Sequence, residues 1–555
     1  MTPENINQTK YNEIHQLFFD TAAKFPENIA MIAGGGKGKS YSYAEVESMV
    51  KNLASWLLSR NRMEKKEIGI ISENRPEWGI AYLAILTAGG TVVPIDANLK
   101  TNEISYIVNH AELDLVFCSG KFESILQGIG RELKILSFEK DSANYFYPSN
   151  QPAIESARVE KNNTALLIYT SGTTGNPKAV ELTHRNILSN LEGIKAALDF
   201  NSGRIFLSIL PLHHTLEGTC GFLAPITSGC KIVYARSLKS KEIVEDIKNN
   251  RITCMCGVPL LYEKMHHSFM KAIDNAPSTR KILFKLFYSV SRVGWSLKKR
   301  WGRTLFKSLR EKAGLGSIDF FVSGGAALPL QISKFFNLIG FNMIEGYGLT
   351  ETSPALSFTR LDNVIFGSVG EPLDNVRLKI NNPNDQGIGE IIVQGENITP
   401  GYRDNPEKTA ELIKDGWLYT GDLGKIEKGC LFITGRAKNL IVSAAGKIIY
   451  PEEIEEKLME SGKVLEAVVF GRKKKDKQQG EDVCALIVPM LDALKEQYNI
   501  SVNNPDMKAI HNIIAELVKE VNNQIATYKR ITIFDVQLEE LEKTSTKKVK
   551  RFVYK

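Results

Sequence analysis

The chain has 555 residues, of which 43% are hydrophobic and 24% charged, and its formal net charge is +7. This length is too great for a single hydrophobic core, so we expect several domains. The composition is that of a soluble globular protein and excludes the disordered and fibrous classes. So mild a positive charge gives no indication of nucleic acid as a partner.

The seven cysteines are scattered along the chain, and none forms a C-x-x-C pair. Their odd number and spacing argue against a zinc site or a disulfide framework and favour a reducing compartment. The first residues lack the basic-then-apolar pattern of a signal peptide. The longest apolar run, residues 79–95, contains Gly89, Gly90 and Pro94 and is too interrupted to span a membrane. We therefore expect a cytoplasmic protein.

The N-terminal half of the chain alternates between strand patterns and helix patterns. Strands are expected at residues 68–71, 90–94, 113–118, 204–209 and 231–234, and helices at residues 76–88 and 102–109. Two more helices are expected from their apolar faces, one with Val46, Val50, Leu53 and Leu57, and one from Thr183 with Ile187, Leu191, Ile194 and Leu198. This alternation predicts parallel βαβ units and an α/β fold.

Residues 165–180 combine a strand with a run of small polar residues. Residues 165–169 are apolar and partly β-branched, which predicts a buried strand. The residues after it are rich in hydroxyls and glycine and lead to a lysine: Thr170, Ser171, Gly172, Thr173, Thr174, Gly175 and Lys178. Backbone N–H groups, hydroxyls and an ammonium group together suit a polyphosphate, although the spacing is not that of the Walker pattern. The alternative interpretation is an ordinary surface turn.

Residues 266–316 differ from the rest of the chain in charge. They carry twelve Lys or Arg against two acidic residues, Asp274 and Glu311, with large apolar residues interleaved. A pair of basic amphipathic helices of this kind can lie on an anionic membrane surface. The alternative is a solvated face over an ordinary core. Peripheral contact with the inner face of a membrane is therefore one of two interpretations.

The last third of the chain changes in character twice. From residue 387 it is punctuated by glycine and rich in strand patterns, at residues 389–393 and 431–434. Beyond residue 436 about 120 residues remain, which is enough for a small domain. Their patterns predict an α+β domain with helices at residues 451–460 and 508–523 and strands at residues 464–471 and 484–488.

Two glycine-containing stretches carry residue types that suit a nucleotide. Residues 321–326 (FVSGGA) form a strand that runs into two glycines, where backbone can approach a flat ring closely. Residues 345–353 (EGYGLTETS) place Tyr347 between two glycines, so that its ring can stack on a base. Thr350 and Glu351 follow, a hydroxyl donor for phosphate and a hard carboxylate ligand for Mg²⁺.

Two later stretches complete the pattern. Residues 415–423 (DGWLYTGDL) include Asp422, a carboxylate that can accept both hydroxyls of a ribose. Residues 435–455 begin with a Gly-Arg pair that includes Arg436 and end in a helix pattern. Each stretch alone has an ordinary explanation, such as a turn or a capping aspartate. Their occurrence together in this order indicates one nucleotide site.

These motifs resemble those of the adenylate-forming superfamily of acyl-CoA synthetases, peptide-synthetase adenylation domains and luciferases. The likeness runs from about residue 13 to residue 554, and is greatest to the long-chain fatty acid–CoA ligases. Residues 73–78 (ENRPEW) and 211–217 (PLHHTLE) are similar to that branch in particular. The resemblance implies a large N-terminal domain (1–436) of βαβ subdomains plus a β-rich subdomain. A small mobile C-terminal α+β domain (437–555) would follow.

The resemblance also implies a role for each matching residue. Thr170 to Lys178 would hold the β- and γ-phosphates of ATP, and the adenine pocket would be lined by Gly324, Gly325, Ala326, Glu345, Gly346, Tyr347 and Gly348. Thr350 would contact the α-phosphate, Glu351 would help to hold Mg²⁺, and Asp422 and Arg436 would bind the ribose. The remaining matches are His214 beside the carboxylate of the acid, Lys438 at the hinge and Gly446 in the coenzyme A channel. His214 could instead be a buried structural histidine.

The last motif departs from the pattern of the family. The family ending usually resembles P-K-T-x-x-G-K-[IV]-x-R, whereas residues 542–551 read EKTSTKKVKR. Alignment on both flanks places the catalytic lysine at Lys548. The glycine before it is replaced by Lys547, which is therefore a rival for the same role. A plain basic tail is the other interpretation.

The resemblance implies an ATP- and Mg²⁺-dependent ligase that joins a medium- to long-chain fatty acid to coenzyme A through an acyl-adenylate. AMP and pyrophosphate would be released. The main alternative is an acyl–acyl-carrier-protein synthetase, with the same adenylation but a protein-borne thiol as the acceptor. A catalytically silent binder and an oxygenase of the luciferase kind are further alternatives.

Overall fold

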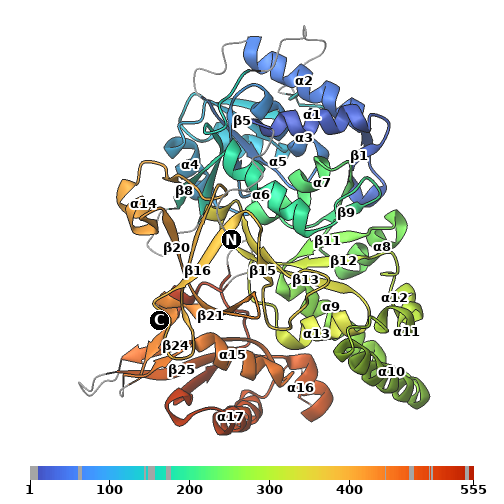
Figure 1. Ribbon diagram of the computed structural model, residues 1–555, viewed down its shortest axis with the longest axis vertical. Helices are drawn as coiled ribbons and strands as arrows, with labels where there is room; N and C mark the ends of the chain where they lie inside the picture. Colours follow the sequence, from blue (N-terminus) through green and yellow to red (C-terminus); the bar gives the residue numbers. More distant parts are fainter. Residues whose placement is uncertain are drawn as a thin grey trace. The chain divides into compact units, whose positions relative to one another are not determined.

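The computed structural model describes residues 11–59, 66–142, 145–147, 157–170, 177–443, 446–473, 480–498, 500–501, 504–543 and 549–554. The chain forms two compact units (Figure 1). The first consists of Met1–Arg377 with Val393–Leu418, and the second of Leu378–Ile392 with Tyr419–Lys555. The α/β class is confirmed, while the domain boundary after residue 436 stays a prediction.

The larger sheet of the first unit has nine strands. Their order is β15 (Glu371–Pro372), β14 (Ala355–Phe358), β13 (Asn342–Gly348), β12 (Phe320–Ser323), β11 (Cys254–Gly257), β9 (Ile205–Ser208), β10 (Lys231–Tyr234), β1 (Ile29–Ile32) and β2 (Ser40–Ser42). The strands from β13 to β1 in this order run parallel, and the strands beyond them pair antiparallel. The carboxyl ends of these six parallel strands therefore meet at one edge.

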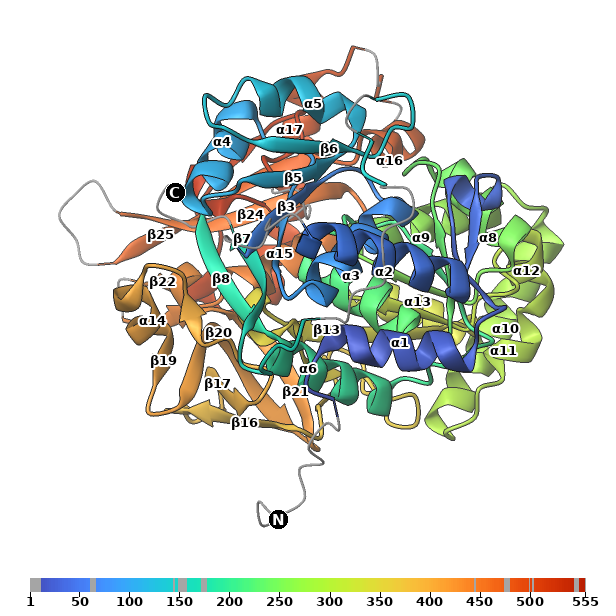
Figure 2. The same ribbon diagram turned by 90° about the horizontal axis from the view of Figure 1, so that it is seen from above.

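The second sheet of this unit has seven strands (Figure 2). Their order is β18 (Gly401–Tyr402), β8 (Lys178–Thr183), β7 (Thr164–Thr170), β4 (Thr91–Ile95), β3 (Glu67–Ile71), β5 (Leu115–Cys118) and β6 (Lys134–Ser137). β7, β4, β3, β5 and β6 run parallel. β4 and β5 are buried along their whole length, which explains their continuous apolar sequences.

Helices flank both sheets of the first unit. They are α1 (Ile14–Lys24), α2 (Tyr43–Ser59), α3 (Pro76–Thr87), α4 (Thr101–His110), α5 (Gly120–Gln127), α6 (His184–Ala197), α7 (Ala224–Ile226), α8 (Ser240–Asn250), α9 (Pro259–Asp274), α10 (Ser278–Ser296), α11 (Gly302–Leu305), α12 (Lys307–Lys312), α13 (Leu330–Leu338) and α14 (Pro406–Leu412). The predicted apolar faces of α2 and α6 are buried. Thr183 caps α6, since its side chain accepts from the Asn186 N–H.

The apolar run at residues 79–95 is part of the protein core. Most of it is α3, every residue of which is buried from Trp78 to Thr87, and the remainder leads into β4. A helix that is apolar on all sides is typical of a core position. No helix in the described part of the chain is both long and apolar enough to cross a membrane. All seven cysteines are free and buried.

The second unit contains an α+β core. A three-stranded sheet has the order β24 (Val464–Lys473), β25 (Glu481–Pro489) and β26 (Ile533–Val536), and its helices are α15 (Pro451–Glu460), α16 (Leu491–Tyr498) and α17 (Met507–Gln524). Short β22 (Ile441–Val442) pairs with β23 (Ile448–Ile449). A further sheet contains residues of both units and has the order β16 (Val376–Asn381), β17 (Gly389–Gly395), β20 (Trp417–Glu427) and β19 (Ile413–Lys414), with β21 (Cys430–Arg436) on β20.

Several strands were missing from the sequence prediction, and the one nearest to the predicted site is β8. Residues 178–183 form β8, which pairs antiparallel with β7 and places Lys178 opposite Thr170. The run after Thr170 is therefore enclosed by two paired strands and does not lead directly into a helix. The apolar pattern of β8 is short, because only Ala179, Val180 and Leu182 are apolar, and it follows directly on a glycine-rich run.

We expect the first unit to lose stability in acid through His184. This residue is fully buried at the start of α6, its Nδ1 accepts a hydrogen bond from the Ile14 N–H at 3.3 Å, and burial lowers its pKa to about 3. Below pH 6.5 the unfolded chain binds a proton that the folded chain does not, so stability falls as the pH falls.

His184→Asn tests this expectation, because the asparagine Oδ1 can replace Nδ1 as acceptor but does not titrate. Between pH 7 and pH 5 the variant should lose about 2 kcal/mol less unfolding free energy than the wild type. Urea denaturation at the two pH values measures the difference. Equal losses in the two proteins would contradict this role of His184.

Candidate active site

Residues predicted to contact the nucleotide and the acid lie at one edge of the nine-stranded sheet. His214 follows β9, Gly324 follows β12, and Tyr347 stands near the end of β13. Ser323 of β12 pairs with Glu345 of β13, so these two segments are direct neighbours. The carboxyl edge of a parallel sheet is where ligands bind in open α/β folds.

Gly324 leaves a narrow space beside this edge. A Cβ atom placed on Gly324 would lie 3.3 Å from Leu216 Cδ2 and 3.6 Å from the Gly346 carbonyl oxygen. Gly325 has a φ of +84°, which L side chains rarely adopt. Backbone rather than side chain thus forms the surface here, as a closely approaching flat ring requires.

Glu345 stabilises the scaffold and does not present its carboxylate at the rim. Its Oε1 accepts a 2.7 Å hydrogen bond from Ser333 Oγ of α13, and the residue is buried. Burial raises the pKa of this carboxyl to about 7. Its carbonyl oxygen accepts from the Thr359 N–H at 2.9 Å, and its N–H donates to Thr359 Oγ1 at 3.3 Å. In the predicted adenine pocket, Glu345 therefore contributes a buried structural side chain and not a free carboxylate.

Thr350 and Glu351 lie in a short 3₁₀ helix (Thr350–Thr352) that two buried asparagines hold in place. The side chains of Asn190 and Asn397 both donate to the carbonyl oxygens of Thr352 and Ala355, at 2.7 to 3.3 Å. The loop therefore keeps its shape through hydrogen bonds to two distant parts of the chain.

Gly348 is the narrowest point of this loop. A Cβ atom there would lie 1.8 Å from the Pro354 carbonyl oxygen and 2.8 Å from its carbon. Both are backbone atoms and cannot move aside like a flexible side chain. Glycine is thus required by packing at this position of the motif.

Glu351 has one fixed and one available carboxylate oxygen. Tyr402 Oη of β18 donates to Glu351 Oε1 at 2.8 Å, and Lys178 Nζ lies 4.9 Å from the centre of the Tyr402 ring. Burial and the carboxylate together raise the pKa of Tyr402, which keeps it a donor. Within the described residues Glu351 Oε2 has no hydrogen-bond partner given by the structure.

The donor set fits Mg²⁺ that is bound together with a phosphate. The described residues contain no group of three His, Cys, Asp or Glu that could enclose a metal ion. Mg²⁺ commonly takes one or two carboxylates and completes its shell with substrate phosphates and water. Glu351, oriented by Tyr402, is a carboxylate of this kind.

The predicted phosphate loop is anchored at both ends. Thr170 ends β7, which lies parallel to β4, and its Oγ1 donates to the Lys178 carbonyl at 3.5 Å. Lys178 begins β8. Ser171, Gly172, Thr173, Thr174 and Gly175 lie outside the described residues, so their predicted role stays a prediction.

His213 and His214 follow β9, and the segment that contains them is held by Asn74 of the ENRPEW motif. Asn74 donates to the Leu210 carbonyl at 2.6 Å and accepts from the Leu212 N–H at 3.1 Å. His213 Nε2 lies 3.4 Å from Asp96 Oδ2, and His214 Nδ1 accepts from the Leu216 N–H at 3.3 Å. His214 is partly exposed, so it is not the fully buried structural histidine of the alternative interpretation.

The second unit contains the remaining described candidates. Asp422 on β20 faces Arg436 on β21, and Arg436 Nε donates to Asp422 Oδ1 at 2.6 Å. The aspartate is buried, whereas the arginine is half exposed. Lys438 lies in a 3₁₀ turn (Ala437–Asn439) directly after β21. The structure thus joins the two predicted ribose ligands as an ion pair.

Two candidates remain, the channel residue Gly446 and the catalytic lysine, and the structure describes only the first. Gly446 has a φ of +71°, donates its N–H to the Ser443 carbonyl at 2.9 Å and has open space where a Cβ would stand. Lys547 and Lys548 lie outside the described residues. Their assignment therefore rests on the sequence.

Family models match most of the chain. The model of the AMP-binding enzymes matches residues 18–403, and that of the AMP-binding enzyme C-terminal domain matches residues 453–548. The chain belongs to the AMP-binding enzyme family. It is accordingly an adenylate-forming acid–CoA ligase that uses ATP, Mg²⁺ and coenzyme A.

Curated relatives of this AMP-binding enzyme include fatty-acid ligases. Fatty acyl-CoA synthetase A of Dictyostelium discoideum is 29% identical over 509 residues, which are 85% of this chain and 76% of the relative. A chloroplastic long-chain-fatty-acid–[acyl-carrier-protein] ligase of Arabidopsis thaliana is 24% identical over 558 residues, with the same two coverages.

Solved structures share the fold of this enzyme. ATP-bound MatB of Rhodopseudomonas palustris has a TM-score of 0.77 at 23% identity, over 98% of both chains. The o-succinylbenzoate coenzyme A synthetase of Bacillus subtilis in complex with AMP has a TM-score of 0.75 at 23% identity, over 96% of this chain and 97% of the other.

Several supporting residues of the AMP-binding enzyme were missing from the sequence prediction. Asn190, Asn397 and Tyr402 lie far along the chain from the loop that they orient, and none stands in a motif. Glu217, in a buried π-helix (Leu216–Leu223), is fully inaccessible, and burial raises its pKa to about 8. Among the supporting residues, only Asn74 and Glu217 lie in segments that the sequence singled out, because residues 73–78 and 211–217 resemble the fatty-acid branch.

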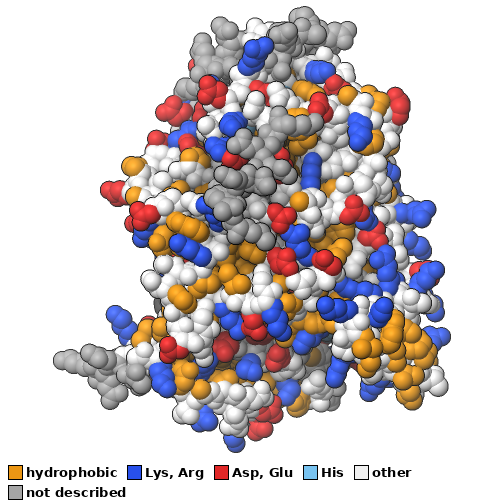
Figure 3. Space-filling view, viewed as in Figure 1, with side chains coloured by type: hydrophobic (Ala, Val, Ile, Leu, Met, Phe, Trp, Pro, Cys, Tyr) orange, Lys and Arg blue, Asp and Glu red, His pale blue; other side chains and the backbone are white. Residues whose placement is uncertain are grey.

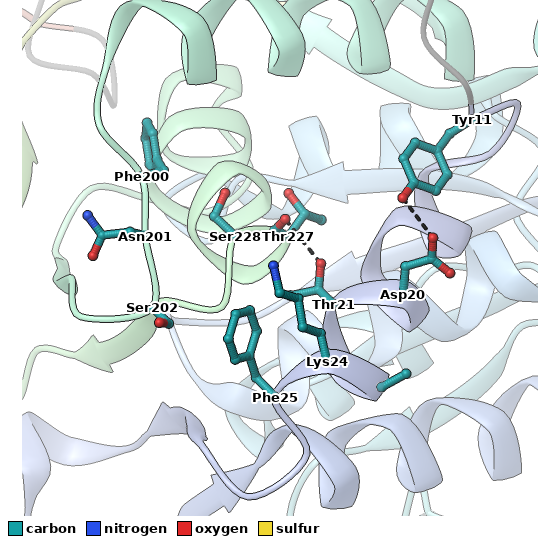
Figure 4. A pocket seen from close by; sticks show the side chains of 11 residues that line it. Tyr11, Asp20, Thr21, Lys24, Phe25, Phe200, Asn201, Ser202, Thr227 and Ser228 are labelled. Carbon is teal, nitrogen blue, oxygen red and sulfur yellow. Dashed lines mark hydrogen bonds between the residues drawn. The ribbon is translucent and has the colours of Figure 1, made fainter.

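A surface hollow of about 700 Å³ in the first unit lies apart from these residues (Figure 4). It is lined by the end of α1 and by segments that flank β9 and α7, including Asp20, Lys24 and Phe200. Tyr11 Oη donates to Asp20 Oδ2 at 2.7 Å across its rim. None of the predicted site residues lines this hollow.

Proposed function

We propose that this enzyme joins medium- to long-chain fatty acids to coenzyme A, with release of AMP and pyrophosphate. The names of curated relatives support the acyl class, since proteins 28 to 29% identical to this chain are called fatty acyl-CoA synthetase, long-chain-fatty-acid–CoA ligase or long chain acyl-CoA synthetase. The observation that carries the chemistry is the fixed loop with Thr350 and Glu351, beside the backbone surface at Gly324.

We assign the site residues as follows. Thr170, Ser171, Gly172, Thr173, Thr174, Gly175 and Lys178 hold the β- and γ-phosphates, and Gly324, Gly325, Ala326, Glu345, Gly346, Tyr347 and Gly348 form the adenine pocket. Asp422 and Arg436 bind the ribose, and His214 lies beside the carboxylate of the acid. When a ribose hydroxyl replaces Arg436 Nε as the donor to Asp422 Oδ1, the aspartate accepts the hydrogen bond of the ribose.

Adenylation requires neutralisation of two anions that repel each other. A carboxylate attacks the α-phosphorus of ATP, the bond to the bridging oxygen breaks, and pyrophosphate leaves. Thr350 donates to the α-phosphate, and Lys548 places an ammonium group near the oxygen that gains charge. Mg²⁺ bound at Glu351 supplies further neutralisation of the phosphate oxygens. Positioning and electrostatics therefore supply most of the rate enhancement.

The second half-reaction requires a different set of groups. The thiol of coenzyme A attacks the acyl carbonyl, and AMP leaves with the electron pair of the broken C–O bond. Lys548 serves no purpose in this step, and the thiol needs a path to the adenylate. We propose that residues 437–555 rotate about Lys438 between the steps and bring Gly446 to the channel of the thiol.

Tyr402→Phe should raise the Mg²⁺ concentration needed for half-maximal activity by about tenfold, because it removes the donor that orients Glu351. The ring over Lys178 is retained, so the change is limited to one hydroxyl. Tyr41→Phe is a matched control, since Tyr41 also donates to a glutamate, Glu77 at 3.2 Å, away from the site. Equal Mg²⁺ dependence in both variants would contradict this role of Tyr402.

Chain-length preference is tested by AMP release from ATP with acids of increasing length and coenzyme A as acceptor. We expect the highest kcat/KM for medium- to long-chain acids and little turnover of acetate or aromatic acids. A maximum at short or aromatic acids would leave the adenylation chemistry intact and overturn the proposed substrate.

The acceptor is tested in the same assay with holo acyl carrier protein in place of coenzyme A. This alternative is favoured by one relative, the acyl-carrier-protein ligase that is 24% identical over 85% of this chain. We expect turnover with coenzyme A. Turnover with holo carrier protein alone would keep the site assignment and change the product to an acyl carrier protein thioester.

A further inference from the structure

Helix α10 exposes a continuous stripe of aliphatic side chains. The members recur every three or four residues and therefore share one face of the helix: Ile282, Leu286, Val290, Val293 and Leu297. Ile282 is 67% exposed and Leu297 59% exposed. Seven of the seventeen large hydrophobic residues exposed in the described chain lie between Ile282 and Trp301, so the stripe is a local concentration.

The opposite face fixes the orientation of the helix. The Phe284 ring centroid lies 5.4 Å from that of Phe306, and Ser291 Oγ donates to the Leu338 carbonyl at 2.6 Å. A Cβ atom on Gly294 would lie 2.6 Å from the Trp301 ring, so the helix and the following turn are closely packed. Because α10 already has a buried face, its aliphatic stripe is a second apolar surface.

The segment that carries this stripe has charged side chains of one sign. Residues 275–310 contain ten Lys or Arg and no Asp or Glu. Lys281, Lys285 and Arg292 recur at helical spacing along one border of the stripe, and none forms an ion pair with any residue that the structure describes. Figure 3 shows orange side chains over α10 with blue ones beside them.

Residues just beyond the helix extend the basic border. Lys298 and Lys299 are exposed and likewise lack an ion pair within the described chain. The Arg300 guanidinium lies 4.1 Å from the centre of the Trp295 ring, and Trp301 is 42% exposed. We call Ile282, Leu286, Val290, Val293, Leu297 and their basic neighbours Lys281, Lys285 and Arg292 the α10 face.

We propose that the α10 face docks on an anionic lipid surface, with the axis of the helix in the plane of the membrane interface. Unpaired cations attract anionic headgroups, and the aliphatic stripe then leaves water for the boundary with the acyl chains. An acidic protein would match the cations but gives no comparable reason for an uninterrupted Ile, Leu and Val stripe. The inference goes beyond the ligase reaction and holds for any acid that the enzyme activates.

The test is co-sedimentation of the full chain with vesicles. We expect binding to vesicles of equal parts phosphatidylglycerol and phosphatidylcholine, weak binding to phosphatidylcholine alone, and release as salt is raised. Lys281→Glu with Lys285→Glu and Arg292→Glu should weaken binding by at least about tenfold. Leu286→Asp with Val293→Asp should weaken it to a similar extent while leaving all cations in place.

Two control variants distinguish a specific effect of the α10 face from a general effect of net charge or of a lost aliphatic side chain. Lys495→Glu with Lys508→Glu and Lys519→Glu reverses three exposed cations of the second unit, the same change in net charge, and should leave binding within about twofold. Leu238→Asp changes an aliphatic residue that is 69% exposed elsewhere and should have no effect. Unchanged ligase activity on a detergent-dispersed acid shows that the α10 variants are folded.

Each other outcome would overturn the proposal. It is wrong if no vesicle pellets the protein, or if the three charge reversals on α10 have no more effect than those in the second unit. Equal binding to phosphatidylcholine vesicles would remove the requirement for anionic lipid. Salt-sensitive binding of holo acyl carrier protein that the α10 charge reversals abolish, without vesicle binding, would assign the face to a protein partner.

Discussion

Lys548→Ala should lower acid-dependent exchange between ATP and pyrophosphate by roughly 10²–10³-fold. The ammonium group acts on charge that develops only as the α-phosphorus is attacked, so its removal affects the transition state more than the binding of ATP. The same variant should convert supplied acyl-adenylate and coenzyme A to acyl-CoA at near the wild-type rate. Measurement of the two half-reactions separately shows the contrast.

Lys547→Ala is the matched control for this prediction, since it removes the same charge one position away. We expect it to change adenylation by less than about threefold, because the alignment gives this charge no direct role and salt screens charges that act at a distance. A larger loss in Lys547→Ala than in Lys548→Ala would show that the alignment is displaced by one residue. Equal loss of both half-reactions in Lys548→Ala would contradict a role confined to adenylation.

Gly348→Ala should abolish most of the activity in both directions of adenylation. The new Cβ atom would lie 1.8 Å from the Pro354 carbonyl oxygen, so the loop must move. A displacement of about 1 Å in positioned groups can lower the rate by about 10²-fold, and Thr350 and Glu351 follow directly. ATP–pyrophosphate exchange and the thermal midpoint should be measured on the same preparation.

Gly128→Ala provides the control for this substitution. A Cβ atom on Gly128 would lie 3.4 Å from the nearest backbone atom, an ordinary contact, and the backbone there is right-handed. Its activity should equal that of the wild type. If Gly348→Ala also retains full exchange activity, the loop with Thr350 and Glu351 is not held as rigidly as we infer.

Much of the fold follows from local pattern. The helix expected at residues 451–460 is α15 with the same bounds, and the apolar faces of α2 and α6 are buried as expected. These elements have a strong period of 3.6 residues together with clear ends, which sequence reasoning can detect. β8 lacked such a signal, because it is short and follows a glycine-rich run.

The residues of the candidate site that stand in motifs could be predicted from the sequence. The residues that hold those motifs in place could not. Thr350 and Glu351 stand in a recognisable stretch, whereas Asn190, Asn397 and Tyr402 are single polar residues separated from it by up to about 160 positions along the chain. Their function depends on hydrogen bonds between distant segments. Periodicity and spacing carry no information about such contacts, so only the fold reveals them.

The identity of the nucleotide product tests the central claim most directly. The purified enzyme would be given α-labelled ATP, Mg²⁺ and a long-chain acid, first without coenzyme A and then with it. We predict that acyl-adenylate and pyrophosphate form in the first stage, and that coenzyme A converts the adenylate to acyl-CoA and AMP. Formation of ADP and phosphate, or AMP production that does not depend on the acid, would contradict the account.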